Sequence, residues 1–427
     1  MKIKRIFAEN YKSFEKLDVK LDDFTLIVGA NAAGKSNLTT IFKFIKDIMI
    51  EGLDNAIALQ GGIDYLANAN SEKNKPIKLG FELDFHDKGW LMRGPNELMI
   101  TTEAISYTFE ILPNKRGKNY QVSYDELKIK YGCVEKLKNN KNTRKIELKP
   151  LNISFSCIYK KKSAQSKYET IEDIPEELTK KSENIKLIFR HADFLLEDLY
   201  REKKELLLYR LSFFLPPLIS EENLIKIYDF DPKKLKRPCM ISARKNLEVD
   251  GSNLAAALQI VLKSKEKYNK FIGLLKNALP FINKISVEQN YDQSYSYKIA
   301  EDYSTKSFYS NFLSDGTVSI IAIIIALYFE EKSTIIIIEE PERNIHPKLL
   351  STVVQMAKDV SKNKQVIFTT HNPEILSNAD LENIRFVQRD KQGYSVVTSP
   401  ADSDRVKAFI NNELGLNDLF LQNLLGD

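Results

Sequence analysis

The sequence predicts an α/β protein built on a mixed or parallel sheet with helices on both faces, interrupted by a large β-rich and helical insertion. Three observations favour this fold. An apolar, β-branched stretch at residues 24–28 is followed by a glycine-rich turn and then by apolar residues at helical spacing. Residues 333–338 and 365–370 are β-branched runs typical of central parallel strands. Residues 76–175 alternate between polar and apolar side chains, as strands with one buried face do.

The chain has 427 residues, which is too many for one ordinary core, and this length predicts two or three lobes. We expect residues 1–75 to form the first half of the α/β domain and residues 241–427 to form the second half. Residues 76–240 are then an insertion, β-rich over 76–175 and helical over 176–240.

The elements of the two halves follow from local patterns. Residues 1–50 predict a strand, a turn, two further strands, the glycine-rich turn and a helix. In the second half, residues 251–258 predict the start of a helix, and residues 284–300 a pair of strands. An apolar helix is expected over residues 319–329, directly before the β-branched strand at 333–338.

Several classes of protein are disfavoured. The longest apolar run, residues 319–327, is about half the ~20 residues that a membrane span needs. The N-terminal residues Met-Lys-Ile-Lys-Arg-Ile lack the apolar core of a signal peptide. The three cysteines (Cys133, Cys157 and Cys239) are scattered, which argues against a disulfide framework and against a zinc site. We therefore expect a cytoplasmic protein that has no membrane partner.

A basic stretch at residues 115–167 holds 15 Lys or Arg and 4 Asp or Glu, although the net charge of the whole chain is only +5. Its interleaved aromatic residues make it a candidate nucleic-acid surface; they are Tyr120, Tyr124, Tyr131, Phe155 and Tyr159. Lysines on the edge strands of a solvated β-hairpin would give the same pattern. The sequence leaves both interpretations open.

The glycine-rich turn fits the P-loop pattern from Gly29 to Ser36 and lies between a predicted strand and a predicted helix. Backbone N–H groups and the positive end of a helix dipole then meet at one place, which favours a bound phosphate. In this pattern Lys35 contacts the β- and γ-phosphates and the Ser36 hydroxyl binds Mg²⁺. The candidate nucleotide-binding residues of this segment are Gly29, Asn31, Gly34, Lys35, Ser36 and Asn37.

Three further segments complete a candidate site. The strand at 335–338 ends in Glu339 and Glu340, a pair suited to holding the metal through Glu339 and to polarising an attacking water through Glu340. Ser314 and Gly316 lie in Leu-Ser-Asp-Gly-Thr, at the predicted start of a helix, where an anion can bind. His371 follows the strand at 365–370, where it either senses a γ-phosphate or simply packs or caps.

The order P-loop, Leu-Ser-Asp-Gly-Thr, Glu-Glu strand and Thr-His resembles the ATPase heads of the ABC class, which include ABC transporter subunits, SMC-type, RecF-like and OLD-family proteins. The resemblance makes Ser314 and Gly316 the signature motif and Glu340 the catalytic glutamate. Three positions depart from the usual pattern: Asp315 replaces a signature glycine, Glu339 replaces an aspartate, and Ala32 stands where repair ATPases often have glycine. The resemblance covers about residues 1–50 and 241–380.

Three segments narrow the resemblance to SMC, RecF and OLD-like heads, and within them to OLD-like ATPases of phage defence. Residues 10–14, Asn-Tyr-Lys-Ser-Phe, are similar to the opening of these heads, where the residues matching Lys12 and Ser13 touch the nucleotide. Residues 340–347 (Glu-Pro-Glu-Arg-Asn-Ile-His-Pro) and 250–255 resemble segments of OLD-like and prokaryotic defence ATPases.

The resemblance implies ATP and Mg²⁺ as ligands, and a homodimer or higher oligomer in which one subunit's signature contacts the γ-phosphate held by the other. The first hypothesis is an ATPase switch of an anti-phage system that controls a separate effector. The 56 residues after His371 leave little room for the Toprim nuclease of OLD enzymes, so we expect any nuclease on another chain. The alternatives are a RecF/SMC-like repair ATPase that grips DNA through residues 115–167, and a transporter ATPase subunit, which the large insertion disfavours. Gln60 stays an open candidate for the Q-loop residue.

Overall fold

The computed structural model describes residues 1–71, 75–85, 90–92, 97–114, 120–139, 142–158, 167–173, 206–209, 224–241, 246–411 and 415–421. The chain divides into two compact units. Unit 1 contains residues 1–21, 36–224 and 389–396, and unit 2 contains residues 22–35, 225–388 and 397–427. Both units are discontinuous in sequence, and the chain passes between them at the junction of Lys35 and Ser36.

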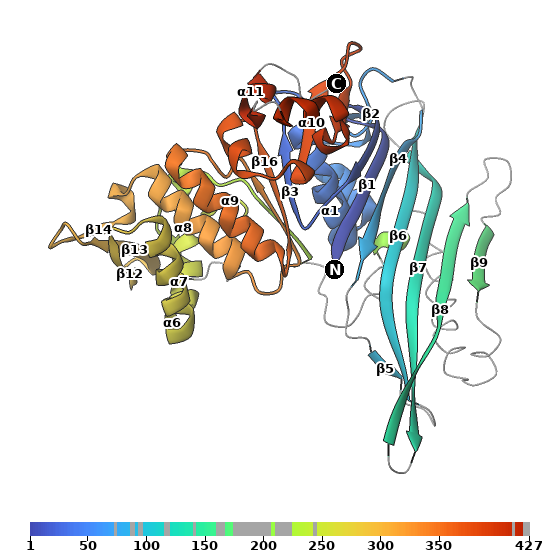
Figure 1. The fold of residues 1–427 in the computed structure, drawn as a ribbon, viewed down its shortest axis with the longest axis horizontal. Helices are drawn as coiled ribbons and strands as arrows, with labels where there is room; N and C mark the ends of the chain where they lie inside the picture. Colours follow the sequence, from blue (N-terminus) through green and yellow to red (C-terminus); the bar gives the residue numbers. More distant parts are fainter. Residues whose placement is uncertain are drawn as a thin grey trace. The chain divides into compact units, whose positions relative to one another are not determined.

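Unit 1 is built on an antiparallel sheet, sheet A, with the strand order β2-β1-β4-β6-β7-β8-β9 and with β5 paired to β6 (Figure 1). The alternation of polar and apolar residues over 76–175 predicted strands, and the described part of this stretch does form β-strands. The strands are β1 (Lys2–Tyr11), β2 (Phe14–Lys20), β4 (Ile77–Asp84), β5 (Trp90–Met92), β6 (Glu97–Pro113), β7 (Tyr120–Asn139), β8 (Asn142–Ile158) and β9 (Lys167–Asp173).

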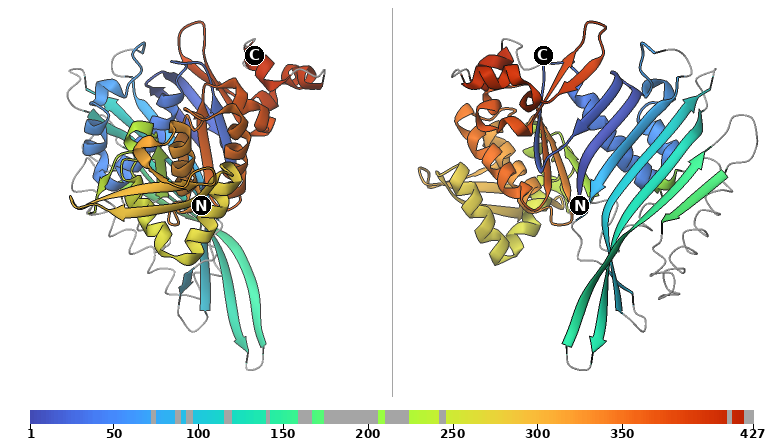
Figure 2. Two further views of the ribbon diagram at one scale, coloured as in Figure 1. Left: turned by 90° about the vertical axis from the view of Figure 1, so that its left-hand side faces the viewer. Right: turned by 45° about the vertical axis from the view of Figure 1, so that its right-hand side comes forward.

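Helix α1 (Lys35–Leu59) runs along one face of sheet A (Figure 2). Its apolar side packs on the sheet through aromatic contacts: the Phe44 ring lies 6.5 Å from that of Phe109 on β6 and 6.4 Å from that of Tyr11 on β1. The helix ends at Leu59, just before the Gln-Gly-Gly break seen in the sequence, and the short helix η1 (Ile63–Tyr65) follows. The N-terminal order of elements is therefore as predicted.

Sheet B has the strand order β10-β15-β16-β3-β17-β18, and all of it except Arg389, Ser395 and Val396 belongs to unit 2. The first five strands are parallel, so their carboxyl ends lie at one edge. The strands are β3 (Phe24–Val28), β10 (Ile225–Tyr228), β15 (Ile335–Glu339), β16 (Gln365–Thr370), β17 (Ile384–Arg389) and β18 (Ser395–Thr398). The predicted strands at 24–28, 333–338 and 365–370 are confirmed. β3 and β16 are buried along their length and β15 is buried from Ile335 to Ile338, as expected for strands covered on both faces.

Helices and a second, smaller sheet complete unit 2. Sheet C has the order β11-β13-β12 with β14 paired to β13, and includes the strand pair expected near 284–300. One apolar core joins sheet B, sheet C and helices α6 to α9. The elements are β11 (Cys239–Met240), β12 (Ile282–Gln289), β13 (Ser294–Glu301), β14 (Ser307–Tyr309), α5 (Pro232–Leu235), α6 (Leu254–Lys263), α7 (Lys265–Ala278), α8 (Asp315–Tyr328), α9 (Pro347–Ser361), α10 (Asp404–Asn411), α11 (Leu416–Leu421), η3 (Ser310–Phe312), η4 (Pro373–Asn378), η5 (Leu381–Asn383) and η6 (Pro400–Asp402).

One difference from expectation lies in the stretch 176–240. Much of it lies outside the described residues, but Ile225–Tyr228 form strand β10 rather than a helix. The reason is tertiary: Ile225 and Tyr228 are buried, and the segment completes a parallel ladder with the four isoleucines of β15. The domain boundaries at residues 75 and 240 stay a prediction. Among the described residues, no helix is both long enough and apolar enough to span a bilayer.

A buried carboxyl group in unit 1 yields a stability prediction. Asp125 on β7 accepts hydrogen bonds from Tyr107 Oη at 2.6 Å and from the backbone N of Leu207 at 2.8 Å. Burial nevertheless raises the pKa of Asp125 to about 7. The folded protein therefore holds a proton that the unfolded chain has lost, and this contribution to stability is full below about pH 4 and disappears as the pH rises through 7.

We expect Asp125→Asn to remove this pH dependence, on the order of a few kcal/mol between pH 4 and 8, because an amide cannot ionise. Urea unfolding of both proteins across that range measures it. Relative to wild type, the variant should gain stability as the pH rises. Asp64→Asn, at an exposed position in the same unit, is the control. Parallel stability curves for wild type and Asp125→Asn would contradict the prediction.

Candidate functional site

The P-loop lies between β3 and α1, as predicted, and buries its lysine. Lys35 is only 8% exposed, and its Nζ atom donates hydrogen bonds to the carbonyl oxygens of Gly29 at 2.8 Å and Ala30 at 3.0 Å. Asn31 is exposed at the tip of the loop, whereas Gly34 is buried. An ammonium group whose partners here are loop carbonyls can exchange them for phosphate oxygens, so the loop fits a nucleotide phosphate.

Glycine is required at position 29 because the backbone of a neighbouring strand lies too close to leave room for a side chain. A Cβ atom at this position would lie 2.3 Å from the carbonyl oxygen of Val387 on β17, a backbone atom that cannot move away alone. The backbone N of Gly29 also donates to the carbonyl oxygen of Thr370, at the end of β16, at 3.3 Å. The loop therefore begins in a position fixed by both strands that flank β3 in sheet B.

The electrostatic surroundings of Lys35 are set by the end of β15. Burial lowers the pKa of Lys35, while the nearby carboxylates of Glu340, Glu342 and Glu339 act in the opposite direction. Strand order explains the proximity, because only β16 separates β15 from β3. The structure thus brings together Lys35, Glu339 and Glu340, three residues that the sequence nominated from segments 300 residues apart.

Glu340 lies directly after β15 and has the unusual backbone angle φ of 46°. Its Oε1 atom lies 2.8 Å from Nδ1 of His371, and its Oε2 atom accepts from Nη2 of Arg343 at 2.9 Å. Partial burial opposes ionisation, but the hydrogen bond from Arg343 and the charges of His371 and Arg343 hold the pKa of Glu340 below its usual range. Glu340 is therefore ionised at neutral pH, as a group that polarises water must be.

Glu342 is a buried neighbour to which sequence reasoning gave no role. It is 6% exposed, its Oε1 atom accepts from the hydroxyl of Thr370, and its Oε2 atom has no hydrogen-bond partner among the described residues. Burial raises the pKa of Glu342. The ends of β15 and β16 are thereby joined beneath the candidate site.

The signature-like segment forms the N-terminus of α8. The Ser314 hydroxyl caps the helix by accepting from the backbone N of Thr317 at 3.1 Å. Gly316 packs against the turn that follows Glu340, since a Cβ atom there would lie 2.7 Å from the carbonyl oxygen of Asn344. Asp315, at the position that departs from the usual signature, pairs with Nζ of Lys236 at 2.5 Å, so its charge is compensated locally.

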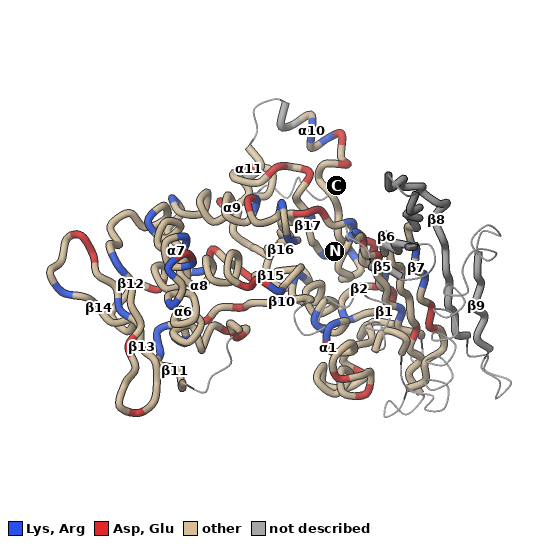
Figure 3. The backbone as a smooth tube through the Cα atoms, turned by 90° about the horizontal axis from the view of Figure 1, so that it is seen from below, with Lys and Arg blue, Asp and Glu red and all other residues tan. Residues whose placement is uncertain are grey.

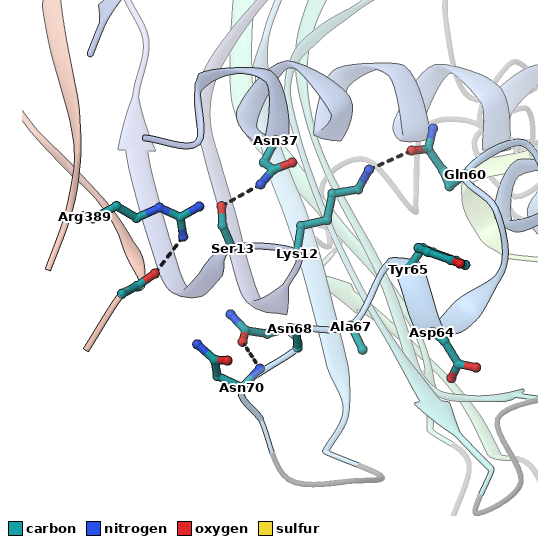
Figure 4. A pocket seen from close by; sticks show the side chains of 12 residues that line it. Lys12, Ser13, Asn37, Gln60, Asp64, Tyr65, Ala67, Asn68, Asn70 and Arg389 are labelled. Atoms are coloured by element: carbon teal, nitrogen blue, oxygen red, sulfur yellow. Dashed lines mark hydrogen bonds between the residues drawn. The ribbon is translucent and has the colours of Figure 1, made fainter. Parts of the chain in front are cut away.

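Lys12 and Ser13 lie in unit 1 and line a pocket of about 460 Å³ (Figure 4). Nζ of Lys12 donates to Oε1 of Gln60 at 3.1 Å, and the Ser13 hydroxyl accepts from Nδ2 of Asn37 at 2.8 Å. Burial and the charge of Lys43 lower the pKa of Lys12. Asn37, which lines the pocket, is the second residue after Lys35 in the sequence.

Some residues of these sites escaped the sequence argument. Tyr65, Asn68 and Arg389 also line the pocket, and the sequence gave no sign of them because their neighbours there are distant in the chain. Arg343 was visible within the Glu-Pro-Glu-Arg block, but its contact with Asp229 was not. Gln60, left open before, is joined to Lys12 in the pocket wall.

Comparison with known proteins supports the fold. Residues 236–377 match the family described as "AAA domain, putative AbiEii toxin, Type IV TA system". No curated protein matches the chain. An SMC head bound to the C-winged helix domain of ScpA aligns over 93% of this chain and 97% of that chain, with 14% identity and a TM-score of 0.51.

Two other SMC heads align at 14% identity. The head domain from Thermotoga maritima covers 93% of this chain and 99% of that chain with a TM-score of 0.40. The head domain from Pyrococcus furiosus, bound to the C-terminal domain of ScpA, covers 96% and 99% with a TM-score of 0.45. On the first of the three structures, the fold is that of SMC-head, ABC-type ATPase domains, as the sequence predicted.

The close approach at Gly29 gives a prediction. We expect Gly29→Ala to lower stability by about 1–3 kcal/mol, because the new methyl group forces β3 and β17 apart, and to weaken ATP binding in parallel. Thermal unfolding and nucleotide titration measure the two effects.

Gly273→Ala is the matched control, since a Cβ atom there meets nothing within 4 Å and the position lies inside α7. It should be neutral or slightly stabilising. If Gly29→Ala behaved like this control, the packing argument at the P-loop would be wrong.

Proposed function

We propose that this chain is an ATP-binding and ATP-hydrolysing switch that dimerises around nucleotide. The observation that carries the proposal is the arrangement in unit 2: a buried P-loop lysine, the carboxylates that end β15, and the histidine that ends β16. The match to an AAA family and the likeness to SMC heads agree with an ATPase.

The roles of the residues follow from their chemistry. Lys35 and the exposed loop tip with Asn31 bind the phosphates, and Gly29 and Gly34 shape the loop. Glu340 orients and polarises the attacking water, and His371 holds the other side of that carboxylate, next to the γ-phosphate. These assignments are supported by the contacts that join Glu340 and His371.

The residues also fit a magnesium ion. Ser36 offers an exposed hydroxyl directly after Lys35, and Glu339 offers a carboxylate at the end of β15. Hydroxyl and carboxylate oxygens are the ligands that Mg²⁺ prefers. When bound, the ion would neutralise the charge on the β- and γ-phosphates.

We propose that Lys12, Ser13 and Asn37 also contact the nucleotide, as the resemblance of residues 10–14 and the P-loop pattern imply. Their pocket of about 460 Å³ is within the usual range for a small-molecule site, and its wall is rich in hydrogen-bonding groups. The lining residue Tyr65 is 71% exposed and offers an aromatic face on which a base can stack.

We assign Ser314 and Gly316 to a nucleotide held by a second copy of the chain. The Ser314 contacts described above lie within α8, and the ion pair with Lys236 leaves no net charge at Asp315 to repel a phosphate. A dimer that closes only with nucleotide acts as a switch, because hydrolysis removes the ligand that favours the closed state.

The wider role we propose is the ATPase subunit of an anti-phage defence system that controls a separate effector protein. The support is the AbiEii-type family description over residues 236–377 together with the OLD-like segments of the sequence. The SMC head of the comparison is itself bound to a domain of another protein, ScpA.

Most side chains of the basic stretch at residues 115–167 lie outside the described residues, so a nucleic-acid partner there stays a prediction. In unit 2, α7 carries four lysines and one glutamate, whereas β12 and β13 each carry one lysine and one glutamate (Figure 3).

We expect Glu340→Gln to bind ATP but not to hydrolyse it, and therefore to accumulate as a nucleotide-bound dimer, because an amide cannot polarise water. Phosphate release and size-exclusion chromatography with light scattering, with and without ATP, measure both effects. Glu382→Gln, at an exposed position of the same unit, is the control. Full turnover by Glu340→Gln would refute the role of Glu340, and a monomer in every nucleotide state would refute the switch.

Lys35→Ala should abolish tight ATP binding, since the loop then lacks its only ammonium group. Isothermal titration with a non-hydrolysable ATP analogue tests this. Lys362→Ala, an exposed lysine in unit 2, should bind as wild type does. Unchanged affinity in Lys35→Ala would show that the loop is not the phosphate site.

A further inference from the structure

Four side chains form a continuous hydrogen-bonded line across the carboxyl ends of three adjacent parallel strands. Asp229 follows β10, Glu340 follows β15 and His371 follows β16. Arg343 bridges Asp229 and Glu340, and His371 contacts Glu340 directly. The middle strand therefore carries the candidate base; β16 supplies His371, which contacts that base, and β10 supplies Asp229, which contacts Arg343.

Arg343 divides its guanidinium group between the two carboxylates. Nη2 and Nε face Oε2 of Glu340 at 2.9 and 3.3 Å, while Nη1 donates to Oδ1 of Asp229 at 3.0 Å and approaches the carbonyl oxygen of Phe230 at 3.4 Å. A planar fork with several fixed donors suits this task, and the single ammonium group of lysine does not. Asp229 and Phe230 thereby fix the plane of the guanidinium group.

The backbone turn that brings Arg343 back to Glu340 is itself unusual. Glu340 and Asn344 both have positive backbone φ angles, 46° and 61°, in a region that residues other than glycine seldom adopt. The turn is closed by hydrogen bonds from the backbone N of Glu340 to Thr369 at 2.8 Å and from that of Arg343 to the carbonyl oxygen of Glu340 at 3.0 Å. Such conformations persist only where surrounding contacts fix them.

We propose that Arg343 is a positioning residue for Glu340, and that Asp229 in turn orients Arg343. The proposal rests on the ATPase function proposed above and names two residues of that site which neither its motifs nor its family description assign. Arg343 holds Oε2 and so leaves Oε1 as the atom directed toward His371, where the attacking water is to be oriented. A glutamate without this contact would sample several side-chain rotamers, and most of them would misdirect the water.

In other catalytic sites a reactive side chain is likewise oriented by a second residue, and that second residue is held by a third. Arg343 touches no reacting atom in this scheme. Its loss should therefore lower the rate of hydrolysis with little change in ATP affinity. Residues that orient metal ligands are typically worth about tenfold to a hundredfold in activity, and we expect a loss of that order for a residue that orients the base.

The test compares steady-state ATP hydrolysis and ATP affinity in wild type, Arg343→Ala, Arg343→Lys, Asp229→Asn and the double variant Arg343→Ala/Asp229→Asn. We expect kcat to fall about tenfold to a hundredfold in Arg343→Ala, and less in Asp229→Asn, with KM and the Kd for ATP nearly unchanged. The double variant should be no worse than Arg343→Ala, because Asp229 acts through Arg343. Arg237→Ala, at an exposed arginine of the same unit, is the control.

Chemical rescue separates positioning from a structural role. Millimolar guanidinium should restore part of the activity of Arg343→Ala, and sodium chloride at equal ionic strength should not. Arg343→Lys retains the charge and much of the stem, so it keeps the proposal testable if the alanine variant does not fold, and it should show a partial loss of kcat.

The outcomes distinguish the two proposals. If wild type hydrolyses ATP and Arg343→Ala or Arg343→Lys does so at the wild-type rate, the inference is wrong and the proposed function stands. A loss of kcat that is matched by lost ATP affinity, or additive losses in the double variant, would also overturn it. If wild type does not hydrolyse ATP, the proposed function fails, and the inference fails with it.

Discussion

The parallel pairing of β10, β15, β16 and β3 is the constraint on which the rest of this structure depends. Parallel strands place their carboxyl ends at one edge of the sheet, and each of these four ends in a residue of the candidate site. The order of the strands in the sheet, which differs from their order in the sequence, decides which side chains lie close together. β16 lies between β15 and β3, so His371 lies between the carboxylates and the P-loop.

The sequence predicted the strands of this sheet that carry strong local signals. The isoleucine run of β15, the buried run of β16 and the P-loop between β3 and α1 were all predicted in place, because burial on both faces leaves few polar residues in such strands. Strand β10 was not predicted. Its four residues, Ile-Lys-Ile-Tyr, are too short a run to stand out from the Leu-, Lys- and Glu-rich stretch before them, and they form a strand because β15 lies beside them, 110 residues further along the chain.

The same distinction holds for the site residues. Lys35, Glu339, Glu340 and His371 stand in motifs whose spacing indicates their chemistry, and the structure brings Lys35 close to both glutamates and Glu340 close to His371. Arg343 and the residues of the 460 Å³ pocket depend on partners that sequence spacing cannot supply; Asp229, for example, lies 114 residues from Arg343. Local chemistry was therefore predictable, whereas the contacts that orient it were not.

Gly316 has a consequence for how sequences of this type are compared. Its backbone approaches the carbonyl oxygen of Asn344 so closely that no side chain fits, and this contact is formed within one chain. A glycine at this place would be retained by evolution even in a homologue that no longer bound nucleotide. Preservation of this glycine alone is therefore a poor criterion for separating nucleotide-binding chains from degenerate ones, and the same holds for Ser314, whose hydroxyl caps α8.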